Sequence, residues 1–194
     1  MSIDHRPRPA TPPAQNPFTG KRAATANRLC DATAEVLREV GYHDLTLHTV
    51  ATRARVARAT AYAYFSSKDR LVAETYWRLL SARTPNPGEA GAPADRVVVI
   101  MRDLVSILTD TPGLPYAVAA ALSGDDPDID RLRAAISRHV HSLLATAAGP
   151  GVDRGDIWLL ELIYTGAMVY AGAGGLDYAD VAAELETAAY RLLG

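Results

Sequence analysis

Basic side chains cluster between residues 46 and 70 of this 194-residue chain. Five Lys and Arg residues stand there against one acid, Asp69, which gives a local net charge of +4. Guanidinium and ammonium groups bind phosphate oxygens, and arginine also reaches the O6 and N7 acceptors of guanine. The cluster therefore indicates contact with a polyanion, the alternative being a basic surface that is simply solvated.

Over the whole chain, too, the positive charge is concentrated in the N-terminal part. Residues 1–84 contain 13 Lys and Arg against 7 Asp and Glu, or +6, whereas residues 85–194 contain 7 against 15, or −8. A basic front half on an acidic body suggests that one end of the molecule approaches nucleic acid.

The spacing of apolar residues predicts helices throughout the chain. Leu29, Val36, Leu37 and Val40 fall on one helical stripe, and Gly41 stands where a left-handed residue would end that helix. No segment alternates convincingly as a strand would. After a first helix that starts near residue 19, we expect helices at residues 47–54, 58–64, 68–83, 94–109, 112–122, 128–147, 154–172 and 177–193.

The two short helices at 47–54 and 58–64 form the pattern of a helix-turn-helix, whose second helix enters the major groove of DNA. Arg58 would reach guanine or a phosphate, or else remain a solvated arginine, and Thr60 offers a hydroxyl and a methyl group. Tyr62 and Tyr64 would place phenols at the DNA backbone, although one of them could belong to the core. Lys68, at the start of the next helix, predicts a phosphate clamp.

A longer pattern of residues surrounds this motif, namely Gly41-Tyr42, Leu45-Thr46, Val50-Ala51, Arg53-Ala54, Val56, Thr60, Tyr62, Tyr64-Phe65, Lys68 and Leu71. The pattern lies within roughly residues 25–72 and resembles the N-terminal domain of the tetracycline-repressor (TetR) family of transcriptional regulators. Family positions that match Thr46 and His48 often touch the DNA backbone. The expected DNA-contacting residues are Thr46, His48, Arg58, Ala59, Thr60, Tyr62, Tyr64 and Lys68.

The resemblance implies an all-α fold, with a three-helix helix-turn-helix domain over residues 19–68 and a larger effector-binding and dimerisation domain over residues 69–194. It also implies a homodimer that binds a palindromic operator in double-stranded DNA. Residues 1–18 hold five prolines and no apolar period, which predicts a disordered arm.

Three residues depart from the family pattern. Arg55 replaces a usual turn glycine, and a left-handed conformation there would cost roughly 1 kcal/mol. Ala57 replaces a usual Ser or Thr and removes a helix cap worth about 1 kcal/mol. Ala61 replaces a larger aliphatic residue. We therefore expect a turn that is looser or differently shaped.

The acidic body has features that suit both of its implied roles. Small residues in 154–172 and 177–193 would allow two subunits to pack closely, the alternative being an ordinary monomer core. Few charges fall on the presumed inner faces, so we expect an apolar or aromatic effector. The large or adaptable side chains available to line a cavity are Tyr76, Trp77, Met101, Leu104, Tyr116, His139, Trp158, Tyr164 and Met168, of which all but Tyr76 form the predicted ligand-binding set.

Other classes of function find little support. The acids of residues 125–130 lie at a predicted helix N-terminus, where the helix dipole explains them, and His139 and His141 point to different faces of a helix. Cys30 reads as a small core residue. There is no glycine-rich phosphate loop or serine elbow, so we expect neither catalysis nor a cofactor or metal. With no apolar segment of spanning length and no secretory signal, the expected location is the cytoplasm, away from membranes.

The sequence thus predicts a dimeric, ligand-responsive transcriptional regulator, expected to be a repressor. Effector binding would favour a state in which the two recognition helices no longer match the operator. One alternative keeps the DNA-binding fold but acts through a protein partner without ligand control. Another is a helical partner-binding module with no affinity for DNA.

Overall fold

The computed structural model describes residues 20–83, 88, 91–175 and 177–194. All regular structure within these ranges is helical, which confirms the predicted all-α class. The helices are α1 (Lys21–Asp44), α2 (Leu47–Arg53), α3 (Arg58–Tyr64), α4 (Lys68–Ser81), α5 (Pro93–Thr109), α6 (Leu114–Leu122), α7 (Pro127–Ala148), α8 (Arg154–Gly172) and α9 (Tyr178–Leu193). The arm predicted at residues 1–18 lies outside the described residues.

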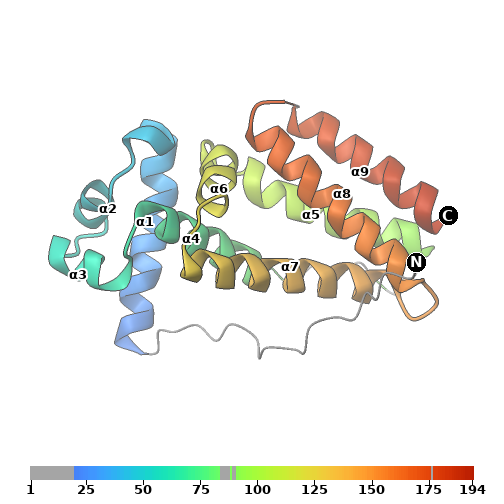
Figure 1. Cartoon of the computed structure of the whole chain (residues 1–194), viewed down its shortest axis with the longest axis horizontal. Coiled ribbons are helices and arrows are strands. Elements are labelled where there is room, and N and C mark those ends of the chain that lie inside the picture. The colour runs from blue at the N-terminus through green and yellow to red at the C-terminus, as the bar shows by residue number, and fades with distance from the viewer. Residues whose placement is uncertain (1–19, 84–87, 89–90, 176) are drawn as a thin grey trace.

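Two groups of helices meet at α4 and α6 (Figure 1). Helices α1, α2 and α3 form one end of the molecule, and α5, α7, α8 and α9 form the other. Helix α4 packs against α1 on one side and against α6 and α7 on the other, while α6 also contacts α1 and α8. Both connecting helices therefore touch both ends of the molecule.

Local signals set most of the helix ends. Polar side chains accept a backbone N–H of the first turn in α2, α4, α7, α8 and α9, and such caps stabilise a helix by about 1 kcal/mol each. Helix α1 differs from expectation, because Gly41 takes a positive φ of 71° with an extended ψ of 179°. The chain then adds one more turn up to Asp44 instead of ending at the glycine.

The apolar stripe of α1 forms the centre of the N-terminal core. Leu29 and Leu37 are buried there together with Val50 of α2 and Phe65, whose 1% exposure confirms its assignment to the core. The buried hydroxyl of Thr33 donates to the Leu29 carbonyl at 2.8 Å, so this polar group costs little inside the core.

The C-terminal group is held by α5, which packs against α7 and α9, and by α8, which packs against α6, α7 and α9. Arg96 of α5 donates to the carbonyls of Ala147 and Ala148, at 2.6 and 2.8 Å, and so satisfies carbonyls in the last turn of α7. Among the helices described, none is both long and apolar enough to cross a membrane.

Candidate DNA interface and ligand cavity

The turn between α2 and α3 is tight. The Val56 N–H donates to the Ala51 carbonyl at 2.9 Å, and the Arg55 N–H donates to the Thr52 carbonyl at 3.1 Å. These two bonds close the end of α2 as a Schellman motif. Arg55 has a φ of 53°, the one positive value at a non-glycine position in the part of the chain that the structure describes. The expected strain is therefore present, but the turn keeps its hydrogen bonds and is not loosened.

A reciprocal cap opens α2. The Thr46 hydroxyl accepts the Thr49 N–H, and the Thr49 hydroxyl accepts the Thr46 N–H, both at 3.1 Å. His48 is exposed beside this cap. Thr46 thus has a structural role in addition to the predicted DNA contact.

Helix α3 presents one face to solvent. Arg58, Ala59 and Tyr62 are exposed, with Tyr62 48% accessible, and Thr60 is half-buried. The Arg58 guanidinium lies 5.6 Å from the centre of the Tyr62 ring, so the two side chains share that face. Ala57 gives α3 no side-chain cap, as expected, while Ala61 is buried against the core. The exposed face therefore combines a cation, a phenol and small side chains, which suits entry into a groove.

The second tyrosine of α3 lies differently. Tyr64 is half-buried and packs against the core cluster, and the Arg22 guanidinium lies 5.4 Å from its ring centre. Of the two tyrosines for which a core position was the alternative, Tyr64 is the one that contacts the core.

Lys68 is held within the protein. Its Nζ donates to the carbonyls of Tyr42 and His43, at 3.0 and 3.4 Å, and lies 4.3 Å from the centre of the Tyr42 ring. The Tyr42 hydroxyl in turn donates to Asp69 at 2.5 Å. Lys68 therefore joins the end of α1 to the start of α4, a role that its position in the sequence did not reveal.

Two further cations of the basic cluster are paired. Arg53 bonds to Glu35 at 3.2 Å and to Glu39 at 2.5 Å, both on α1. Arg70 pairs with Asp128 at the start of α7. Arg55 and Arg58 form no ion pair with any described residue, so they carry the free positive charge beside the turn.

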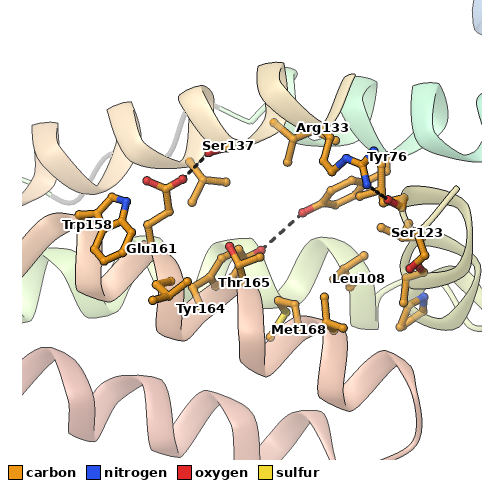
Figure 2. A pocket seen from close by; sticks show the side chains of 18 residues that line it. Tyr76, Leu108, Ser123, Arg133, Ser137, Trp158, Glu161, Tyr164, Thr165 and Met168 are labelled. Carbon is orange, nitrogen blue, oxygen red and sulfur yellow. Dashed lines mark hydrogen bonds between the residues drawn. The ribbon is translucent and has the colours of Figure 1, made fainter. Parts of the chain in front are cut away.

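A cavity of about 530 Å³ lies in the other half of the molecule, between α4, α5, α6, α7 and α8 (Figure 2). Three residues of the predicted ligand-binding set line it: Trp158, Tyr164 and Met168. Tyr76 of α4 also reaches the cavity. Most other lining side chains are aliphatic, so the cavity suits a largely apolar molecule.

The other five residues of that predicted set lie away from the cavity wall. Met101 and Leu104 are buried in the core, and Trp77 packs edge-on against His139 with ring centres 5.5 Å apart. Tyr116 is exposed and contacts α1, where its hydroxyl lies 3.2 Å from Nε2 of His43. Residue type alone did not indicate which face of each helix would turn inward.

Polar groups are placed at three points along the cavity (Figure 2). The hydroxyls of Tyr76 and Tyr164 lie 3.5 Å apart at its centre, and burial raises the pKa of both phenols, so they are neutral hydrogen-bonding groups. Glu161 and Arg133 are the charged residues among those that line the cavity. Glu161 lies beside Trp158 at one end, and Arg133 lies at the other.

The outer face of α8 is apolar and exposed. Its exposed apolar side chains recur at helical spacing and comprise Trp158, Leu159, Leu162, Ile163, Val169 and Tyr170. Trp158, Leu162 and Val169 also line the cavity, whereas Leu159, Ile163 and Tyr170 do not. Gly166 lies within this stripe, and an added Cβ there would meet no atom within 4 Å.

Reactive thiols and metal sites were also sought among the described residues. Cys30 is buried in the core, and burial raises the pKa of its thiol to about 12, so the thiol stays protonated. Across the described ranges, no three His, Cys, Asp or Glu residues are grouped so that they could hold a metal ion.

Comparison with known proteins identifies a family model that matches the N-terminal part of the chain and relatives that match most of its length. The sequence model of bacterial regulatory proteins of the tetR family matches residues 29–75. The chain is 39% identical over 168 residues to an uncharacterized HTH-type transcriptional regulator of Mycobacterium tuberculosis, covering 85% of this chain and 78% of that relative. It is 28% identical over 150 residues to the HTH-type transcriptional repressor KstR of the same organism, covering 70% and 68% of the two chains.

Solved structures share the fold. A TetR transcriptional regulator from Rhodococcus sp. RHA1 superimposes with a TM-score of 0.72 at 23% identity, covering 90% of this chain and 98% of that one. The transcriptional regulator FadR from Bacillus subtilis, in complex with stearoyl-CoA, superimposes with a TM-score of 0.57 at 16% identity, covering 87% and 97%. The relatives and the fold are those of regulators, not of enzymes.

Proposed function

Because the chain belongs to the tetR family of bacterial regulatory proteins, whose members are DNA-binding transcriptional regulators, we propose that it acts as a homodimeric repressor. A small, mostly apolar molecule would release it from a palindromic operator. The repressor KstR, which is similar over 70% of the chain, supports the assignment to repression.

In this proposal residues 19–68 read DNA and residues 69–194 bind the effector and form the dimer. Arg58, Ala59, Thr60 and Tyr62 of α3 contact the major groove, because this face carries free positive charge beside a well-bonded turn. Thr46 and His48 at the start of α2, with Tyr64 and Lys68, contact phosphates at the edge of the interface.

The dimer forms through the apolar outer face of α8. Two helix-turn-helix units then reach half-sites about one turn of B-DNA apart, roughly 34 Å, and gain the affinity that one short motif lacks. Gly166 supports this assignment, since its open environment leaves room for a partner helix to approach closely.

The proposal of effector release rests on one observation, namely that the cavity is lined in part by α4, the helix that also contacts the DNA-binding end of the molecule. Tyr76 of α4 lines the cavity, and the same helix begins at Lys68, which is bonded to the end of α1. A ligand that favours another position of α4 would thereby change the separation of the recognition helices. A coupling of about 1–3 kcal/mol is typical of such systems. The stearoyl-CoA complex of FadR, a protein of the same fold, is consistent with a small-molecule effector.

The proposal is tested by selecting random duplex DNA with the purified full-length protein. We expect a palindromic winner whose affinity falls steeply with salt, because each neutralised phosphate releases counterions. Arg58→Ala should relax preference at one base position, at a cost of about 1–3 kcal/mol per half-site. The control is Arg138→Ala, which removes an exposed arginine from α7 and should leave both sequence preference and salt dependence unchanged.

The outcomes separate the alternatives. Selection of a palindrome, followed by its release when a screened small molecule is added, supports a ligand-controlled repressor. Palindrome binding that no small molecule relieves favours regulation through a protein partner. Failure to enrich any duplex, or binding without salt dependence, would contradict the DNA interface proposed above.

A further inference from the structure

The cavity lining includes one carboxylate, Glu161, which is largely shielded from solvent. The Glu161 side chain is 14% exposed, and it projects into a space whose other lining is mostly aliphatic and aromatic. A carboxylate that is shielded from solvent attracts a cationic partner more strongly than an exposed carboxylate does. The partners of Glu161 therefore decide what the cavity can accept.

Neutral or weakly basic groups bind Glu161 on one side. Its Oε1 accepts the Ser137 hydroxyl at 2.5 Å, and its Oε2 lies 3.0 Å from Nδ1 of His141. A hydroxyl adds no charge, and the imidazole forms an ion pair with Glu161 only when it is protonated. Both partners belong to α7, and each carboxylate oxygen has a second lone pair that these two contacts do not use.

The charge at the opposite end is already neutralised. Arg133 pairs with Asp130, and its guanidinium also donates to the carbonyls of Leu122 at 2.8 Å and Gly124 at 3.4 Å. These bonds turn the cation toward the connection between α6 and α7. Glu161 is therefore the charged residue of the cavity lining that has no Lys or Arg partner among the described residues.

Trp158 lies one turn before Glu161 on α8, and both side chains occupy the same end of the cavity (Figure 2). An indole ring attracts cations through the negative face of its π system. The lining then continues along α8 to Val169, eleven residues or about 16 Å further at 1.5 Å per residue. The site is elongated, with an aromatic and acidic end and a long apolar body.

We propose that the effector is an elongated apolar amine whose cationic nitrogen binds Glu161 and Trp158 and whose hydrocarbon part fills the cavity toward Met168. This inference rests on the proposed function and narrows its ligand class. A molecule that places a carboxylate at this end would face repulsion from Glu161.

The test compares three ten-carbon probes that differ only in their head group: decylamine, decanol and decanoate. Binding to the full-length protein is measured by isothermal titration calorimetry at about pH 8, where an alkylamine is protonated and an ordinary imidazole is neutral. We expect decylamine to bind at least tenfold more tightly than decanol, and decanoate to bind most weakly.

Glu161→Gln keeps the size of the side chain and removes its charge, so the tenfold preference should fall to about twofold or less. Glu184→Gln makes the same change at an exposed position on α9 and should keep the preference of the parent protein. Far-UV circular dichroism checks that each variant is folded. Glu161→Lys provides a second variant, in which decanoate should become the preferred probe.

Each result bears on a different part of the argument. Equal binding of all three probes, or a preference that persists in Glu161→Gln, would overturn the amine inference while leaving an effector cavity in place. Preferential binding of decylamine without release of the selected DNA would support the inference but contradict ligand-controlled repression. No binding of any probe would overturn both.

Discussion

Arg55 holds a backbone conformation that glycine adopts at lower cost. Its φ of 53° places it in the left-handed region, where a Cβ atom adds about 1 kcal/mol of strain. Arg55→Gly should therefore raise the free energy of unfolding by about 1 kcal/mol, measured by urea denaturation. The same variant should bind DNA less tightly, because it also removes one of the two cations beside the turn that form no ion pair with the described residues.

The matched control is Arg58→Gly, which makes the same chemical change at the first residue of α3. Arg58 is helical, so glycine there should lower the free energy of unfolding by up to about 1 kcal/mol. Opposite signs for the two variants would establish strain at Arg55, and equal destabilisation would contradict it.

His139 gives the protein a dependence of stability on pH. Burial lowers the pKa of this imidazole from its ordinary value of 6.5, and its Nε2 is buried without a hydrogen-bond partner among the described residues. The unfolded chain therefore takes up a proton at this site more readily than the folded protein. Its contribution to stability is complete above about pH 6.5 and is lost as the pH falls below that value.

We expect His139→Gln to reduce the loss of stability between about pH 7.5 and pH 5.5, because glutamine does not titrate. Denaturant melts of the parent and variant at both pH values provide the measurement. An undiminished loss in the variant would show that other groups cause the acid sensitivity.

The structural role of a single residue can be predicted from the sequence in some cases and not in others. The strain at Arg55 could be predicted because the turn motif fixes the backbone there. The carbonyl partners of Lys68 could not, since they belong to residues 42 and 43 and reach Lys68 only when α1 packs against α4. Local geometry follows from a motif, whereas a contact between distant segments needs the packed structure.

At the scale of elements, Gly172 allows α6 and α8 to approach. A Cβ built on this residue would lie 2.8 Å from Cβ of Ala119 and 3.1 Å from the Pro115 carbonyl oxygen. Gly172→Ala must push the two helices apart and should destabilise the protein by about 1–3 kcal/mol. Because both helices line the cavity, ligand affinity should fall as well.

Gly151→Ala is the control for this change. Gly151 lies in the connection between α7 and α8, and an added Cβ there meets no atom within 4 Å. Its free energy of unfolding should stay within about 0.5 kcal/mol of the parent value. A comparable loss in both variants, measured by thermal or urea unfolding, would argue against a close contact at Gly172.

The helices themselves could be predicted well, since caps, prolines and glycines act within a few residues. Their ends agree with the predicted ranges to within about three residues, apart from the extra turn after Gly41. The inward face of each helix was harder to identify. Met101 and Tyr164 both lie on apolar stretches, yet only Tyr164 reaches the cavity, because helix rotation is decided by packing between helices.

At the scale of the whole molecule, the acidic end of the cavity could not be predicted from the sequence. Glu161 stands in an apolar segment, and its partners Ser137 and His141 are more than 19 residues away on another helix. The apolar outer face of α8 was easier to predict, because its small and apolar residues all belong to one continuous segment of the sequence.

Ile163→Glu should convert the proposed dimer into a monomer. Ile163 is exposed on the apolar stripe of α8 but does not line the cavity, so the ligand site stays intact. A carboxylate buried between two subunits loses its hydration, and its copy in a symmetric interface stands close by. We expect the dissociation constant of the dimer to rise at least a hundredfold, about 3 kcal/mol, in sedimentation equilibrium.

Val40→Glu places the same charge on an exposed apolar position of α1, far along the chain from α8, and should leave the dimer intact. The monomeric variant should lose most of its affinity for a palindrome yet keep its affinity for a single half-site, because only the linkage of two half-sites is removed. A variant that remains dimeric would place the interface elsewhere. A monomeric parent protein that binds the palindrome tightly would remove the need for two linked recognition helices.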